Sequence, residues 1–165
     1  MDHEYKFHKL NSNFCLWYHN PNEHGWELED YTKLIKFNTV EEYWYYLGFL
    51  DDKIICYSML FLMKNDIKPI WEDESNINGG YISIKLTRDK TIEQWKKLCD
   101  NFVSGNYTDE INGISITTKK NFNIIKIWFP NIIEASDYKF PENLGINDNS
   151  FIFRNHKNNL NKQSK

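Results

Sequence analysis

The sequence predicts an α+β domain in which helices cover one face of a mostly antiparallel β-sheet. Seven short apolar segments have the length of strands, and two further segments repeat apolar residues at helical spacing. A chain of 165 residues with 41% hydrophobic side chains is large enough for one core and too small for two ordinary ones. We therefore expect a single domain over residues 1–165, with residues 1–6 and the polar tail 158–165 flexible.

Capping residues mark the starts of two predicted helices. The first begins at Thr39, and Glu42 three positions later completes a capping box. Its apolar stripe consists of Val40, Tyr43, Trp44 and Leu47. The second begins near Thr91, with Gln94 as its capping partner, and ends before Gly105. Its apolar stripe consists of Ile92, Trp95, Leu98, Cys99 and Phe102.

Strands are predicted where short apolar runs lie between turn signals. The predicted strands cover residues 14–18, 34–37, 54–63, 81–86, 114–118, 124–129 and 151–154. Two of them, 81–86 and 114–118, alternate apolar and polar residues, as half-buried antiparallel strands do. Gly79-Gly80 and Asn112-Gly113 are turn signals in front of these strands.

Composition and charge exclude several classes of protein. A net charge of −3 excludes binding of nucleic acid through a broad basic surface. No segment reaches the roughly 18 to 20 apolar residues of a membrane span, and the N-terminus lacks the layout of a secretory signal. The three cysteines lie far apart, so we expect neither a disulfide framework nor a metal site, and a cytoplasmic location.

Two tryptophans in predicted loops are the strongest functional signal. Trp71 follows a proline and precedes the carboxylate of Glu72, and Trp26 follows a turn-rich segment at 20–25. Two indoles can sandwich a flat ligand, and a cationic ring adds a cation–π component. N7-methylguanine fits this description, because its N1–H and N2–H₂ edge matches a bidentate carboxylate. Packing of either tryptophan in the core is the competing interpretation.

An enzyme is a weaker interpretation of the same segment. Glu72, Asp73 and Glu74 could bind Mg²⁺, but adjacent side chains diverge and no second acidic cluster supplies further ligands. The sequence contains no glycine-rich phosphate loop, and its histidines lie in no nucleophile pattern. We therefore expect a binding protein without a cofactor.

The chain resembles the eukaryotic translation initiation factor 4E family, which binds the 5′ cap of messenger RNA. The resemblance runs from His8 to about Lys162 without large gaps. Its pieces occur in family order: 8–10, 16–17, Trp26, 37–44, 67–74, Asn76, 79–80, 112–113, 125–128, 138–139 and 144–146. This ordered set implies a curved antiparallel sheet with a cap slot on its concave face and about three helices on its convex face.

The resemblance implies roles for residues at the cap slot. Trp26 and Trp71 would stack on the methylated base, and Glu72 would bind its edge. The Trp71 backbone N–H would donate to the base O6, and Trp128 would lie near the methyl group. The triphosphate would be held by basic side chains, for which the candidates are Lys119, Lys120, Lys126, Arg154, Lys157 and Lys162. For each of these cations, a solvated surface position is the alternative.

The family's second surface receives a helix from a 4G-like scaffold or from a repressor protein. The matching positions are His8, Lys9, Val40, Trp44 and Lys96. Lys9 replaces a usual proline, and Lys96 replaces a usual apolar residue, so we expect a partner peptide with acidic residues. Pro141 would shorten the family's last helix.

The resemblance thus predicts a monomeric protein that binds capped mRNA (m7GpppN) and recruits it to translation initiation through a scaffold. A translational repressor or cap protector that engages no productive scaffold is the alternative. The implied partners include no membrane.

Overall fold

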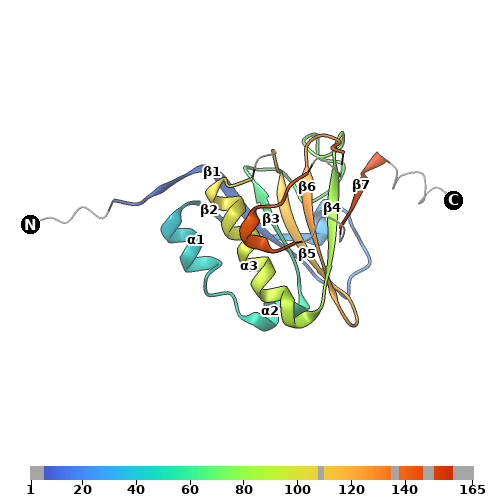
Figure 1. Cartoon of the computed structure of the whole chain (residues 1–165), viewed down its shortest axis with the longest axis horizontal. Coiled ribbons are helices and arrows are strands. Elements are labelled where there is room, and N and C mark those ends of the chain that lie inside the picture. The colour runs from blue at the N-terminus through green and yellow to red at the C-terminus, as the bar shows by residue number, and fades with distance from the viewer. Residues whose placement is uncertain (1–5, 108–109, 135–137, 147–150, 158–165) are drawn as a thin grey trace, which may run out of the picture.

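The computed structural model describes residues 6–107, 110–134, 138–146 and 151–157. Within this part of the chain, seven strands form one curved sheet in the order β2-β1-β3-β5-β6-β4-β7, and every neighbouring pair is antiparallel (Figure 1). The strands are β1 (Lys9–His19), β2 (Tyr31–Thr39), β3 (Met59–Lys64), β4 (Gly80–Leu86), β5 (Gly113–Thr118), β6 (Asn123–Phe129) and β7 (Phe151–Asn155).

The helices lie together on one side of the sheet (Figure 1). They are α1 (Val40–Tyr46), α2 (Asp52–Tyr57) and α3 (Arg88–Ser104). Two short 3₁₀ turns, η1 (Leu28–Asp30) and η2 (Glu142–Leu144), lie in the connections, and Leu28 of η1 packs on the opposite face of the sheet. The predicted α+β class is confirmed. None of the helices in the described ranges is long and apolar enough to cross a membrane.

Strand alternation gives the sheet two different faces. The face toward the helices is apolar, and its buried side chains include Leu60, Leu62, Ile114, Ile116, Ile125 and Ile127. These pack with Trp95, Leu98, Cys99 and Phe102 of α3. The intervening residues Ser115, Thr117, Ile124, Lys126 and Trp128 line a cavity on the opposite face. Helix packing therefore leaves one face of the sheet available for a ligand.

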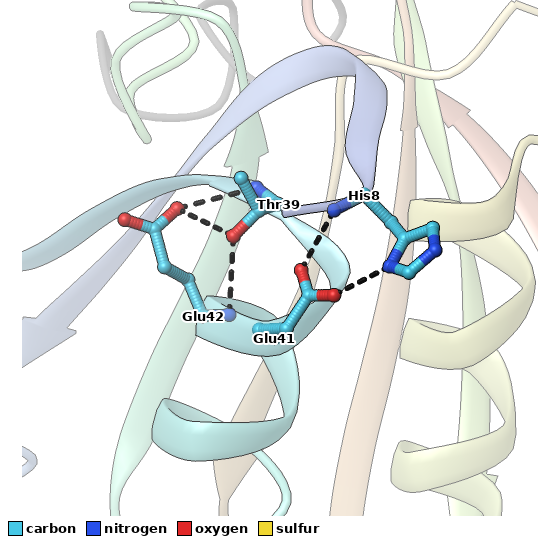
Figure 2. Close-up of polar contacts among 4 residues, drawn as sticks. All are labelled: His8, Thr39, Glu41 and Glu42. Atoms are coloured by element: carbon cyan, nitrogen blue, oxygen red, sulfur yellow. Dashed lines mark hydrogen bonds and ion pairs between the residues drawn. The ribbon is translucent and has the colours of Figure 1, made fainter. Parts of the chain in front are cut away.

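The predicted start of the first helix is confirmed. Thr39 is the N-cap of α1, its Oγ1 accepts from the Glu42 backbone N–H at 3.2 Å, and Glu42 Oε2 accepts from the Thr39 N–H at 3.2 Å (Figure 2). The start of the second helix was predicted too late, because α3 begins at Arg88. Thr91 donates to the Thr87 carbonyl at 2.9 Å and Gln94 to the Leu144 carbonyl at 3.1 Å, so these two side chains form no capping box.

The predicted strand over residues 54–63 is wrong in its first half. Residues 52–57 form α2, and the strand begins only at Met59. Asp51 caps this helix by accepting from the Lys53 backbone N–H at 2.7 Å, and Ser58 ends it in an extended conformation. Ile55 and Cys56 are buried. A continuous apolar run does not distinguish a helix from a strand, so periodicity could not place this boundary.

The remaining strand predictions are confirmed with shifted ends, since β1 and β2 are longer than the predicted 14–18 and 34–37. The helix α3 ends before Gly105, as predicted, and Gly105 adopts the left-handed conformation with φ 76°. Between residues 138 and 146, the only regular element is η2, which follows Pro141 directly, in agreement with a shortened last helix. Residues 1–5 and 158–165, predicted to be flexible, lie outside the described residues.

Candidate functional site

A cavity of about 460 Å³ lies on the face of the sheet opposite the helices. Its walls are largely aromatic, formed by Trp26, Tyr31, Phe61, Trp71, Tyr81 and Trp128. Lys119, Lys126 and His156 add polar groups. The two loop tryptophans are 45 positions apart in the sequence, and the fold brings both to this one cavity.

Trp71 lies on the loop between β3 and β4, and buried amides hold this loop in place. Asn76 has no exposed surface, and its side chain donates to the backbone carbonyls of Lys68 at 3.0 Å and Ile70 at 2.8 Å. Asn112, at the start of β5, donates to Asn76 Oδ1 at 2.9 Å. The segment immediately before Trp71 is therefore tied to the sheet through two side chains.

The acid two residues after Trp71 also acts on this loop. Asp73 accepts from the backbone N–H groups of Lys68 at 3.1 Å and Ser75 at 2.9 Å. Its carboxylate is therefore occupied with backbone donors and closes the loop on itself. Of the three consecutive acids, Asp73 thus has a structural role, whereas Glu72 and Glu74 are exposed.

Trp26 lies on the loop between β1 and η1, and half of its surface is exposed. Its ring stacks on the imidazole of His19, with the ring centroids 4.5 Å apart and the planes at 9°. His19 Nε2 lies 2.7 Å from the Gly25 carbonyl oxygen. Because a carbonyl can only accept, Nε2 carries a proton and donates.

Glu72 lies outside the aromatic cavity, in a neighbouring polar cavity that shares Ile70 with it. It lines this polar cavity together with Asp66, Asp73, Glu74 and Glu110, and is not among the residues that line the aromatic one. Its charge nevertheless acts on the aromatic cavity, because burial raises the pKa of Tyr31 and Glu72 raises it further. The aromatic cavity thus has one acidic border.

Trp128 forms part of the deep wall. Only 6% of its surface is exposed, and its Nε1–H donates to Ser115 Oγ at 2.9 Å. Its ring centroid lies 5.2 Å from that of His156. Burial, and then the charge of Lys126, lowers the pKa of His156 to about 4, so this imidazole is neutral at pH 7.

Lys126 is the most unusual cation of the cavity. It lies between Ile124 and Trp128 in the alternation of β6, and its Nζ is 4.3 Å from the Tyr81 ring centroid. Burial, followed by the charges of Lys119 and Arg154, lowers the pKa of the ammonium to about 8. Within the described ranges no carboxylate forms an ion pair with Lys126. A half-buried cation beside two other positive charges attracts an anion.

The other predicted phosphate ligands are placed differently. The backbone carbonyl of Lys120 accepts from Arg88 at 2.9 Å, and this lysine does not line the cavity. Lys157 Nζ donates to Asn78 Oδ1 at 3.0 Å. Lys162 lies outside the described residues. Lys119, Lys126 and Arg154 therefore form the cationic group that the described structure brings together.

Sequence reasoning had not assigned a role to His19, Tyr31, Phe61, Asn76 or His156. Strand alternation could have identified Phe61, which is out of phase with Leu60 and Leu62, but the start of β3 was predicted wrongly. No sequence signal indicates that Asn76 is buried, because it lies in an otherwise polar loop.

Comparison with known proteins identifies the family. The model of the family described as eukaryotic initiation factor 4E matches residues 9–165. This chain belongs to the eukaryotic initiation factor 4E family. The family resemblance that the ordered motifs indicated is therefore confirmed.

Individual relatives of this 4E-family chain cover most of it. Eukaryotic translation initiation factor NCBP of Oryza sativa subsp. japonica is 31% identical over 140 residues, which cover 81% of this chain and 60% of that protein. Eukaryotic translation initiation factor 4E-2 of Schizosaccharomyces pombe is 32% identical over 167 residues, which cover 89% of this chain and 66% of that protein. The chain thus spans less than two thirds of the length of these curated relatives.

Solved structures show the same fold. The complex of C. elegans eIF4E-3 with the 4E-binding protein Mextli and a cap analog matches with a TM-score of 0.80 and 21% identity, over 97% of each chain. Ascaris suum eIF4E-3 in complex with an m7G cap matches with a TM-score of 0.73 and 21% identity, over 92% of each chain.

This 4E-family chain has a second cavity, of about 320 Å³, on its helical face. Its apolar side is formed by Leu10, Val40 and Trp44, and 54% of the Trp44 surface is exposed. Asp100 of α3 contributes the one ionisable carboxylate among the lining residues and accepts from the Tyr43 hydroxyl.

The other residues predicted for this surface lie at its margin. Glu41 accepts from the His8 backbone N–H at 3.0 Å, and its other oxygen lies 2.6 Å from His8 Nδ1 (Figure 2). Lys9 pairs with Thr39 at the end of the β1–β2 ladder. Lys96 forms an ion pair with Asp52 at 3.2 Å. None of His8, Lys9 and Lys96 lines the cavity, so its own charge comes from Asp100 instead.

Proposed function

We propose that this chain binds the 7-methylguanosine cap of messenger RNA in the aromatic cavity. The observation that carries the proposal is that Trp26 and Trp71, on two separate loops, line one cavity together. Membership of the 4E family supports it, as do the related structures of eIF4E-3 in complex with a cap analog or an m7G cap. The methylated base enters between the two indoles, where its positive charge strengthens stacking.

Groups beside the cavity read the edge of the base. Glu72 accepts from the guanine N1–H and N2–H₂ groups, and the Trp71 backbone N–H donates to O6. The exposed position of Glu72 beside Tyr31 supports this role. Trp128 forms the wall that the methyl group approaches, although little of its ring is exposed.

The charge distribution around the cavity favours one direction for the triphosphate that extends from the bound base. Acidic residues line the neighbouring cavity that contains Glu72, whereas Lys119 and Lys126 line the aromatic cavity and Arg154 lies close enough to lower the pKa of Lys126. The triphosphate therefore runs toward the three cations. Lys126 contributes most, because it is half-buried and carries no carboxylate partner in the described ranges.

The cavity on the helical face binds a helix of a partner protein, through which the capped message enters translation initiation in the cytoplasm. The related structure of C. elegans eIF4E-3 in complex with the 4E-binding protein Mextli supports this role. Trp44, Val40 and Leu10 receive apolar side chains of the partner, and Asp100 receives a basic or hydroxyl-bearing one. This preference replaces the acidic partner expected from Lys9 and Lys96, since Lys96 pairs with Asp52.

Titration of the chain with 7-methyl-GTP and with GTP, followed by intrinsic tryptophan fluorescence, tests the proposal. We expect strong quenching by 7-methyl-GTP and much weaker quenching by GTP, because the unmethylated base is not a cation. Equal responses to the two nucleotides would refute cap binding. Incubation of the cap analogue with the chain and Mg²⁺ should return it intact, and its hydrolysis would identify an enzyme instead.

A further inference from the structure

His19 lies behind Trp26 as a further aromatic layer. It is the last residue of β1, has no exposed surface and does not line the aromatic cavity. Its ring lies parallel to the Trp26 indole at 4.5 Å. The imidazole thus covers the face of Trp26 that points away from the cavity, and the indole keeps its other face for a ligand.

Two further contacts keep the imidazole in this position. Its Nε2–H donates to the Gly25 carbonyl at 2.7 Å, which ties the residue before Trp26 to the sheet. The Tyr31 ring contacts it edge-on, with centroids 4.9 Å apart and planes at 64°. The stacked ring and the hydrogen bond to Gly25 together restrict the loop that carries Trp26. Less conformational entropy is therefore lost when a ligand binds.

The side chains around the His19 ring come from neighbouring strands. Tyr31 faces the ring from β2, and His19 pairs with Met59 of β3. The sheet therefore holds the imidazole, and the loop that carries Trp26 rests on it.

We propose that His19 is a positioning residue that stacks behind Trp26 and prepares the indole for a cationic base. The proposal rests on the cap-binding function. A flat ring behind Trp26 fixes the orientation of the indole before the ligand arrives, so less side-chain and loop entropy is lost on binding. Removal of the ring leaves the inner face of the indole uncovered and frees the loop, and binding weakens.

Fluorescence titrations with 7-methyl-GTP at pH 7.5 test this role in the whole chain. His19→Phe keeps a flat ring behind Trp26, whereas His19→Ala removes it. His24→Phe is the matched control, because His24 is an exposed histidine on the same loop. Circular dichroism of each variant separates loss of the fold from loss of the positioning ring.

We expect His19→Ala to bind 7-methyl-GTP about 3- to 10-fold more weakly than wild type, because the indole loses the ring behind it. His19→Phe should bind within about twofold of wild type. His24→Phe should match wild type.

Unchanged affinity of a folded His19→Ala would overturn the positioning role. An equal loss of affinity in His19→Phe would overturn it as well, because that variant keeps a ring behind Trp26. If His19→Ala does not fold, His19→Leu, which fills the volume without a flat ring, takes its place. Failure of the wild type to prefer 7-methyl-GTP over GTP at pH 7.5 would instead refute the proposed function itself.

Discussion

Proton uptake by Lys126 is the most quantitative consequence of the proposed phosphate site. In the free protein, burial and the charges of Lys119 and Arg154 lower the pKa of Lys126 to about 8. At pH 8 this lysine is therefore protonated in about half of the molecules, and at pH 7 in about nine tenths. A phosphate beside the ammonium favours the charged form and raises the pKa again. Binding should then take up about 0.5 proton at pH 8 and about 0.1 at pH 7.

Isothermal titration calorimetry with 7-methyl-GTP measures this uptake directly. The observed enthalpy is recorded in buffers of different ionisation enthalpy, and its slope against that enthalpy is the number of protons bound. His156 does not contribute, because its pKa is lowered to about 4 and it stays neutral at both pH values. Affinity should fall as the pH rises through 8, since the cation is lost there.

Two variants distinguish proton uptake by Lys126 from proton uptake or release by the ligand itself. Lys126→Arg keeps a charge that remains protonated, so it should retain binding and lose the uptake. Lys126→Met removes the charge and should weaken binding as well. An uptake at pH 8 that is the same in wild type and Lys126→Arg would show that the protons come from another group, and the assignment of Lys126 to the phosphates would be refuted.

Three further substitutions test the other parts of the site. Trp71→Ala should weaken binding of 7-methyl-GTP by about 1–3 kcal/mol with an unchanged circular dichroism spectrum, and normal affinity would reject the stacking role. Glu72→Gln should reduce the preference for methylated guanine over methylated adenine in competition titrations; unchanged selectivity would point to another carboxylate. Trp44→Ala should abolish capture of the partner helix in a pull-down while cap affinity stays intact, because 54% of its surface is exposed on the helical face. Joint loss of both activities would indicate damage to the core.

Local signals predicted the parts of the fold that local interactions stabilise. The Thr39–Glu42 capping box, the end of α3 before Gly105 and the alternation in β4 and β5 all depend on neighbouring residues, and all were predicted correctly. The error in residues 54–63 arose where a helix and a strand share one apolar run. There the boundary is decided by what Ile55 packs against, which no neighbouring residue reveals.

The sequence predicted which residues form the candidate site, but it did not predict the contacts that hold them in place. Trp26, Trp71 and Lys126 were identified from loop context and family resemblance, and the structure brings all three to one cavity. Asn76 and His19, which hold the two tryptophan loops, were not assigned roles. Their importance comes from burial against distant carbonyl groups and rings, and burial is a property of the folded chain.

The sequence by itself determined the class of the fold, the order of the family motifs and the chemical character of the ligand site, which is aromatic with one acid and few cations. Only the tertiary structure determines which side chains are buried and desolvated. Burial lowers the pKa of Lys126, leaves His19 Nδ1 without a hydrogen-bond partner among the described residues and joins Asp100 to Tyr43 in the groove of the helical face. Desolvation and pairing depend on residues far apart in the chain, so they follow from packing and cannot be read from neighbouring positions.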